Sequence, residues 1–228
     1  NIRIEPCDNT IKEGIPFHLV YRVSDVTNGT CLPLKDAQVD IWHCDADGEY
    51  SGVQDSGFDT SDEMWLRGYQ VTDEDGIAEF LTIVLGWYSG RAVHIHFKIR
   101  TIGTDGESYE FTSQLFFDPE QIEVLYATDP YADKGLPDTP NSTDSIYQNS
   151  GGQLTLELTA MEEENIAELQ EKLEDLDITY GYKAIFDIGL DLSDTAVAAS
   201  DSAGGGGGFG GNPPNGNGRG GNPPGDRP

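Results

Sequence analysis

The sequence is poor in positive charge and contains no long apolar run. In 228 residues, 13 Lys and Arg stand against 41 Asp and Glu, which gives a formal net charge of −28. A surface this acidic repels phosphate backbones and anionic lipid headgroups, so the composition argues against nucleic-acid binding and against binding to a membrane surface. No apolar run approaches the roughly 20 residues that a membrane-spanning helix needs, so membrane insertion is not expected.

Cysteine is scarce as well. Cys7, Cys31 and Cys44 allow at most one intramolecular disulfide. Cys31 and Cys44 are the natural pair by sequence, but a straight strand between them would carry their Cα atoms beyond the ~7 Å that a disulfide can bridge. Cysteine usage therefore gives little support for an oxidising compartment. The chain begins with Asn1 instead of Met, which fits a processed mature form or an engineered start.

Short apolar or alternating stretches separated by turn signals run through most of the chain. They predict strands near residues 17–23, 39–44, 68–72, 77–83, 93–100, 111–117, 154–158 and 182–190. The turn sequence Asp-Glu-Asp-Gly at residues 73–76 further predicts a hairpin between the third and fourth of these strands. Many short strands with little helix are typical of an all-β fold, and we expect an antiparallel β-sandwich.

One late stretch has helical periodicity instead. An apolar stripe in residues 161–177 predicts a short surface helix inserted between two late strands; its members are Ile166, Leu169, Leu173 and Leu176. Such a stripe either docks on its own domain or binds a partner, and docking on the domain is the expectation.

The composition changes abruptly near residue 199 to Gly, Asn and Pro. A segment with so little to bury cannot offset its conformational entropy. The sequence therefore predicts a single folded domain over residues 1–198 and a disordered tail over residues 199–228.

The sharpest chemical signal is the segment Arg-Ala-Val-His-Ile-His-Phe at residues 91–97. Residues two apart on a strand point to the same face, so His94 and His96 can present both imidazoles to one metal ion. Tyr50 follows an Asp-Gly turn, and Tyr88 lies shortly before the histidines. Two phenolates and two imidazoles form a hard, anionic donor set that suits iron(III), whereas iron(II) more usually takes two histidines and a carboxylate.

Other interpretations of these residues remain open. A His-x-His pair on a strand is often two hydrogen-bonded histidines, and a tyrosine is often a packing residue. His43 and Cys44 offer a softer zinc site, but successive strand residues point to opposite faces, which argues against both binding one ion.

Several motifs in order along the chain resemble the signatures of the intradiol ring-cleavage dioxygenases. The first is Val-Asp-Ile-Trp-His-Cys-Asp-Ala-Asp-Gly-Glu-Tyr-Ser-Gly at residues 39–52. Further matches lie at residues 66–73, 86–97, 112–117, 129–132 and 138–147. The resemblance runs from about Ile2 to Leu192 and points to the secreted single-domain branch of the family.

The resemblance implies a two-layered β-sandwich that holds iron(III) through Tyr50, Tyr88, His94 and His96. Tyr88 would be the ligand that leaves the metal and takes a catechol proton when the substrate binds. Arg91 and Gln114 match residues that steady the reacting oxygens. The implied reaction uses O2 to cleave a catechol-type ring between its hydroxyl-bearing carbons and gives a cis,cis-muconate-type diacid.

The resemblance also carries expectations about partners and location. The partners would be a small-molecule catechol and O2, and the enzyme would be secreted or extracellular, or periplasmic. The N-terminal helical region through which larger relatives dimerise has no counterpart in this sequence, so we expect a monomer or a weak homo-oligomer. The alternatives are an extracellular β-sandwich binding module with a decayed metal site and a zinc hydrolase.

Overall fold

The computed structural model describes residues 1–55, 57–173 and 176–194. The predicted tail at 199–228 and the domain boundary before it lie outside the described residues. The strands are β1 (Pro16–Asp25), β2 (Leu32–Pro33), β3 (Gln38–Trp42), β4 (Arg67–Val71), β5 (Ile77–Ile83), β6 (His94–Ile102), β7 (Ser108–Phe117), β8 (Thr155–Leu156), β9 (Thr159–Ala160) and β10 (Tyr182–Leu190). The α-helices are α1 (Pro119–Leu125), α2 (Ser145–Asn149) and α3 (Glu163–Lys172), and the 3-10 turns are η1 (Thr27–Gly29) and η2 (Asn141–Thr143).

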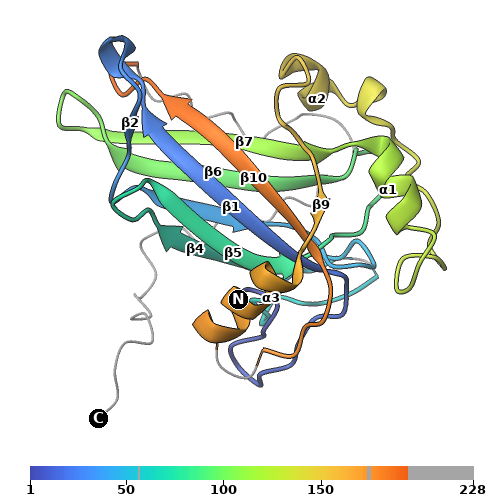
Figure 1. Cartoon of the computed structure of the whole chain (residues 1–228). Coiled ribbons are helices and arrows are strands. Elements are labelled where there is room, and N and C mark those ends of the chain that lie inside the picture. The colour runs from blue at the N-terminus through green and yellow to red at the C-terminus, as the bar shows by residue number, and fades with distance from the viewer. Residues whose placement is uncertain (56, 174–175, 195–228) are drawn as a thin grey trace.

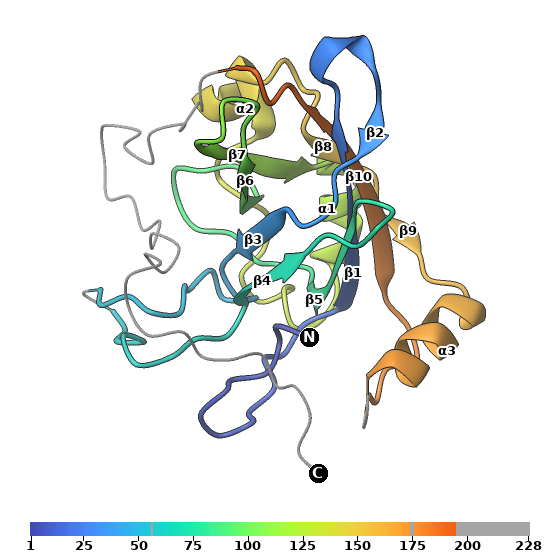
Figure 2. The same ribbon diagram turned by 90° about the vertical axis from the view of Figure 1, so that its left-hand side faces the viewer.

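The strands form two packed layers (Figures 1 and 2). One sheet has the order β2-β1-β10-β9, with β5 also paired to β1, and the other has the order β4-β3-β6-β7-β8. Most neighbours are antiparallel, but β1 pairs with β10 and β7 pairs with β8 in parallel. The sheets are therefore mixed, and the prediction of a purely antiparallel sandwich is wrong in that respect. Parallel neighbours need a long connection, which the chain between Phe117 and Thr155 supplies for β7 and β8, and the chain between Asp25 and Tyr182 supplies for β1 and β10.

The core lies between the two sheets. Alternate residues of β1, among them Phe17, Leu19 and Tyr21, face alternate residues of β6, such as Ile95 and Phe97, and all are buried in one cluster. The rings of Tyr21 and Phe97 lie 5.7 Å apart across this interface. Because successive strand residues alternate between faces, the histidines of β6 point away from the core.

The prediction of a hairpin between residues 68–72 and 77–83 is wrong, although the turn at residues 73–76 forms. Asp73 N donates to Ile77 O at 3.0 Å, and the Asp73 carboxylate accepts from the amides of Asp75 and Ile77. However, β4 pairs with β3 in one sheet and β5 pairs with β1 in the other. The turn thus carries the chain from one layer to the other, because alternation of apolar residues defines the faces of a strand but not its neighbour.

Figure 1 shows α1 beyond the end of β7, and Figure 2 shows α3 apart from both sheets, beside β10. In α3, Ile166 and Leu169 pack with Leu81, Met161 and Ile178, which confirms the prediction that this helix docks on its own domain. It is shorter than the predicted 161–177. The expectation of one inserted helix is also wrong, because α1 and α2 occur as well; at 7 and 5 residues they are too short to show periodicity in the sequence.

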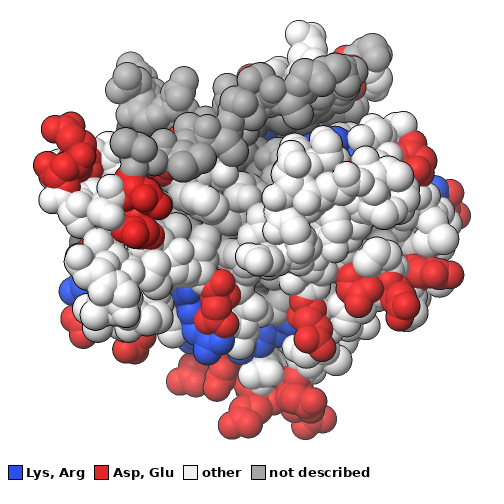
Figure 3. Space-filling view, turned by 90° about the horizontal axis from the view of Figure 1, so that it is seen from above, with Lys and Arg blue, Asp and Glu red and all other residues white. Residues whose placement is uncertain are grey.

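The acidic composition is visible on the surface. Figure 3 shows Asp and Glu side chains standing out around the face seen from above, while Lys and Arg form small patches. Among the described residues no helix is both long enough and apolar enough to cross a membrane.

Candidate metal centre

The four side chains predicted as metal ligands converge beside β6. His94 and His96 are 1% and 5% exposed, and their Nε2 atoms lie 3.1 Å apart. Tyr88 Oη lies 3.3 Å from His94 Nε2. The ring of Tyr50 lies 5.8 Å from that of Tyr88 and 6.2 Å from that of His96, measured between centroids. The structure therefore brings two loops and one strand together at a single point.

Both imidazoles are oriented by contacts behind them. His94 Nδ1 lies 2.7 Å from the carbonyl oxygen of Ala92, to which it can donate. His96 Nδ1 faces Gln114 Nε2 at 3.3 Å, and the ring stacks on Trp42 with centroids 4.8 Å apart and an interplanar angle of 8°. These contacts leave both Nε2 atoms facing the tyrosines. His94, whose Nδ1 can donate to a backbone carbonyl, is held as metal-binding histidines commonly are.

The loop between β3 and β4 positions Tyr50. Thr60 Oγ1 donates to the carbonyl oxygen of Tyr50 at 2.5 Å. Next to it, Ser51 Oγ donates to Trp65 O at 2.6 Å and accepts from Arg67 Nε at 2.9 Å. Tyr50 is only 1% exposed, so its ring is enclosed as well as tethered.

The loop between β5 and β6 brings Tyr88 against the Tyr50 loop. Gly86 N donates to Asp45 O at 2.8 Å. A Cβ atom at Gly86 would lie 2.0 Å from Ala46 O, so only glycine permits this close approach. On its other side the loop is tied by Ser89 Oγ, which donates to Asp138 Oδ2 at 2.6 Å. Tyr88 itself stays partly buried, and its ring is less enclosed than that of Tyr50.

Burial shifts the pKa of all four groups toward their neutral forms. Desolvation raises the pKa of Tyr50 well above its ordinary value and raises the pKa of Tyr88 to about 12. The same cause lowers the pKa of His94 to about 3 and that of His96 well below its ordinary value. Without a cation the phenols and imidazoles thus stay neutral, and a positive ion at their centre would favour the phenolates.

The buried oxygen of Tyr50 fits a metal ligand. It has no hydrogen-bond partner in the structure. A buried hydroxyl left unpaired costs roughly 1–3 kcal/mol, and a metal ion would supply the missing contact. No cluster of three or more His, Cys, Asp and Glu that could hold a metal is found in the described part of the chain. The centre beside β6 is of another kind, because half of its donors are tyrosines.

Arg91 and Gln114, predicted to steady the reacting oxygens, lie directly behind the predicted ligands. Arg91 Nη2 donates to Gln114 Oε1 at 2.5 Å. Its Nε donates to Asp144 Oδ2 at 2.8 Å, so the guanidinium is paired with a carboxylate whose side chain is only 1% exposed. Every site residue predicted from the sequence is therefore near the others, and their roles belong to the proposal below.

Sequence reasoning missed two neighbours of the site, Trp42 and Asp144. Trp42 lies on the same face as His96, directly opposite it in the register of β3 and β6. Asp144 stands just before a short helix, and an Asp in that position signals a helix cap, not a contact with an arginine far away in the sequence. Only the pairing of distant segments reveals either contact.

The alternative zinc pair does not form. Both ring nitrogens of His43 are engaged, with Nδ1 at 2.7 Å from Cys44 O and Nε2 at 2.6 Å from Thr82 Oγ1. All three cysteines are free: Cys44 is buried, and Cys7 and Cys31 are exposed. Cys31 and Cys44, the pair suggested by the sequence, therefore do not form a disulfide.

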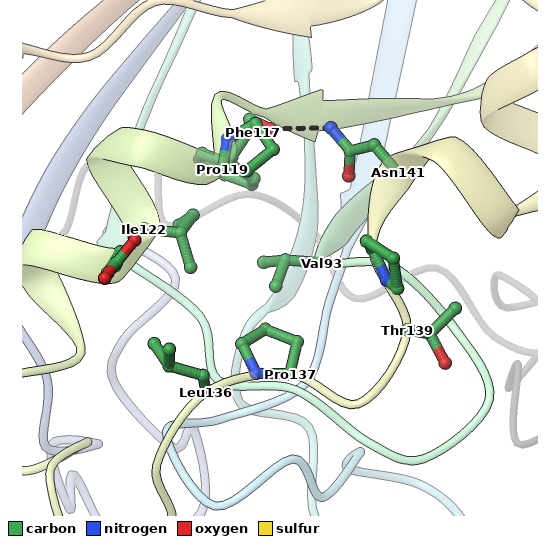
Figure 4. A pocket seen from close by; sticks show the side chains of 10 residues that line it. Val93, Phe117, Pro119, Ile122, Leu136, Pro137, Thr139 and Asn141 are labelled. Atoms are coloured by element: carbon green, nitrogen blue, oxygen red, sulfur yellow. Dashed lines mark hydrogen bonds between the residues drawn. The ribbon is translucent and has the colours of Figure 1, made fainter.

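A separate apolar cavity of about 180 Å³ lies near the centre but does not belong to it. Figure 4 shows it between α1, the segment 136–141 and Val93, with Asn141 Nδ2 donating to Phe117 O at 2.9 Å. None of the four predicted ligands lines it. Val93 faces this cavity, whereas its neighbour His94 faces the tyrosines.

Comparison with known proteins agrees with this geometry. A family profile described as Dioxygenase matches residues 8–134, a stretch that contains all six predicted site residues. A chlorocatechol 1,2-dioxygenase from Rhodococcus opacus is 29% identical over 126 residues, which cover 47% of this chain and 42% of that protein. Another, from Cupriavidus pinatubonensis, is 31% identical over 101 residues, which cover 37% of this chain and 37% of that protein. The matches thus span less than half the length of these curated relatives.

Solved structures show the same fold. An intradiol ring-cleavage dioxygenase from Tetranychus urticae aligns with a TM-score of 0.61 at 25% identity, over 81% of this chain and 85% of that one. A catechol 1,2-dioxygenase from an Acinetobacter species aligns with a TM-score of 0.55 at 21% identity, over 83% and 55% of the two chains. Because the family profile covers more than half of the sequence, this chain belongs to the intradiol ring-cleavage dioxygenase family.

Proposed function

We propose that this chain is a non-haem iron(III) dioxygenase that opens catechol-type rings with O2 between the hydroxyl-bearing carbons and yields muconate-type diacids. The observation that carries the proposal is the convergence of two buried phenols and two buried imidazoles, one phenol oxygen being without any partner. The names of the chlorocatechol 1,2-dioxygenases to which the chain is similar support a catechol as substrate.

Tyr50, Tyr88, His94 and His96 would hold the iron. When bound, iron(III) supplies a Lewis acid and electron acceptor that makes a chelated catechol reactive toward dioxygen. The two tyrosines differ in what the fold lets them do. Tyr50 is enclosed and tethered through Thr60, which suits a permanent ligand. Tyr88 is only partly buried on its loop, which suits a side chain that moves aside.

Tyr88 is the residue to which we assign proton transfer. A catechol that binds through both oxygens must lose two protons, and a phenolate oxygen near the substrate can receive one of them. Burial raises the pKa of Tyr88 to about 12, so in this position its oxygen would hold a proton in preference to releasing it. A positioned base of this kind contributes on the order of 10²–10⁴-fold to a rate.

Arg91 and Gln114 complete the proposed machinery. The guanidinium places positive charge beside the ligands, and Gln114 joins it to His96. Fixed charge of this sort favours electron-rich species that form during a reaction without having to reorganise. Arg91 and Gln114 are thus assigned to steady the reacting oxygens, Arg91 through its positive charge and Gln114 together with the guanidinium that it contacts.

Two further parts of the proposal concern the molecule as a whole. We propose a monomer or a weak homo-oligomer, and a secreted, extracellular or periplasmic location. Equilibrium sedimentation of the purified protein tests the first, and fractionation of the source cells tests the second.

The experiment that tests the function is ring cleavage of catechol by the iron-loaded protein under ¹⁸O2. We expect a muconate-type diacid that carries both labelled oxygen atoms, and no product from a His96→Ala variant. Tyr180→Phe is a control, because Tyr180 is 58% exposed and is not one of the predicted ligands. Binding of a catechol without its conversion would favour the binding-module alternative, and activity that requires zinc would favour a hydrolase.

A further inference from the structure

We propose that Asp144 is a positioning residue of the candidate centre: its carboxylate holds Arg91 and the peptide of Ala92, and through them it orients Gln114 and both histidines. The inference rests on the proposed function, because these positions matter to a reaction only if the four ligands hold a metal. Asp144 itself touches none of the ligand side chains.

The carboxylate of Asp144 is saturated by hydrogen bonds from two directions. Oδ2 accepts from Arg91 Nε at 2.8 Å and from Ala92 N at 3.1 Å. Oδ1 accepts from Ile146 N at 2.9 Å and from Tyr147 N at 3.1 Å. An ionised carboxylate offers about four acceptor positions, and all of them are used in Asp144. Asp144 therefore joins the start of α2 to the segment that leads into β6.

Two short paths run from this carboxylate to the ligands. The first passes through one peptide: Ala92 N donates to Asp144, and Ala92 O faces His94 Nδ1 at 2.7 Å. The second passes through side chains: Arg91 Nη2 donates to Gln114 Oε1, whose Nε2 lies 3.3 Å from His96 Nδ1. Both histidines thus have an orienting contact that depends on the position of residues 91 and 92.

The charge of Asp144 matters as well as its shape. Its side chain is 1% exposed and that of Arg91 is 22% exposed, so the ion pair is largely removed from water. Asn or Ser can still cap a short helix, because both accept hydrogen bonds from the first turn. Neither can also present a second charged oxygen to Arg91 and Ala92. Substitution of Asp144 by Asn or Ser therefore keeps its helix-capping role and removes its charged contact with Arg91 and Ala92.

The chain provides a matched control for the capping task. Asp118 caps α1, where its side chain accepts from Glu120 N at 2.9 Å on the surface. Asp118→Ser removes an aspartate from a helix cap without touching the centre. Any effect of Asp144→Ser beyond that of Asp118→Ser belongs to the contacts with Arg91 and Ala92.

The first arm of the test uses the iron-loaded enzyme. We expect Asp144→Ser and Asp144→Asn to retain iron while kcat falls about 10–100-fold, the usual effect of removing an orienting contact behind a metal ligand, and the visible absorption band to shift. Asp118→Ser should leave both unchanged. In the double variant that combines Asp144→Ser with Arg91→Lys, the fold-loss in kcat should be smaller than the product of the two single fold-losses, because both changes break the same contact. If Asp144→Ser loses no more activity than the control and keeps its spectrum, the inference is overturned.

The second arm needs no metal and no activity. In the ¹⁵N NMR spectrum of metal-free protein, the ring nitrogens of His94 and His96 should shift in Asp144→Asn, while those of His43, which has its own partners, should not. Unchanged His94 and His96 signals overturn the role of Asp144 whatever the chemistry of the site. If instead the parent protein neither binds iron nor cleaves catechol, the proposed function fails, and this arm still decides whether Asp144 orients the histidines.

Discussion

Two buried groups of tyrosine and histidine in this protein use the same side chains in opposite ways. In the first, Tyr126 and Tyr131 stack with their centroids 5.1 Å apart, and their hydroxyls donate to the carbonyl oxygens of Leu85 and Val84. His43 is likewise engaged at both ring nitrogens. In the second group, the predicted ligand set, the polar ends face one another and one phenol has no partner.

The difference teaches that burial alone does not mark a functional site. The polar atoms of the first group are hydrogen-bonded to backbone carbonyls and, in the case of His43 Nε2, to the hydroxyl of Thr82, so none is left for a ligand. The second keeps its polar atoms turned inward, where a cation would satisfy all of them together. Lack of a partner is not sufficient either: the hydroxyl of Tyr21 is also unpaired, but its ring packs among the phenylalanines Phe80, Phe97 and Phe186. Convergence and lack of partners must coincide.

The sharpest way to break this comparison is to remove a histidine from each group. His94→Ala or His96→Ala should abolish iron binding and colour, because each deletes a predicted ligand. His43→Gln should keep both, although it should lower the free energy of unfolding by roughly 1–3 kcal/mol through the lost buried hydrogen bonds. Iron content by elemental analysis and the visible spectrum decide the matter. If His43→Gln lost iron and His96→Ala kept it, the metal would belong to the group that contains His43.

A second experiment compares the two tyrosines within the predicted ligand set. Tyr88→Phe should still bind iron but form its catechol complex on the order of 10²–10⁴-fold more slowly, because no phenolate takes the second proton. Tyr50→Phe should instead shift the absorption band of the catechol complex. Anaerobic stopped-flow mixing measures both effects. Fast association in Tyr88→Phe together with slow association in Tyr50→Phe would exchange the roles of the two tyrosines.

A third experiment removes one tyrosine hydroxyl from each group and compares the free energies of unfolding of the metal-free proteins. Tyr126→Phe leaves the carbonyl of Leu85 without its 2.7 Å hydrogen bond and should lower the free energy of unfolding by about 1 kcal/mol. Tyr50→Phe removes a buried hydroxyl that has no partner and should raise that free energy by a similar amount. Urea unfolding of the two variants side by side gives the signs. Equal destabilisation by both would mean that Tyr50 has a structural partner after all.

The smallest effect is expected from the C-terminal segment. Its composition offers little to bury, so a chain ending near Ala203 should keep both its turnover and its thermal midpoint. Loss of activity on truncation would place part of that segment in the site and move the domain boundary.

Local features of the fold were predictable from the sequence, and pairings between distant segments were not. The strands at 77–83 and 182–190 agree residue for residue with β5 and β10, because alternation and turn residues are local signals. The partners of these strands depend on the whole chain, which is why the parallel pairing of β10 with β1 and the separation of β4 from β5 were missed.

The site shows the same division. The motifs indicated Tyr50, Tyr88, Arg91, His94, His96 and Gln114, and the structure places these residues together. The contacts that orient them come from elsewhere: Trp42 through the register of β3 and β6, and Asp144 through a helix cap that faces an arginine. A sequence motif records a residue type, whereas these contacts require that two distant segments meet.

The most direct test of the account is the visible spectrum of the iron-loaded protein before and after catechol is added without oxygen. Tyrosinate bound to iron(III) absorbs visible light, so a phenolate-ligated centre predicts a reddish protein with about one iron per chain. Its band should shift when catechol binds and vanish in His96→Ala. A colourless, iron-free protein that still cleaves catechol would contradict the account.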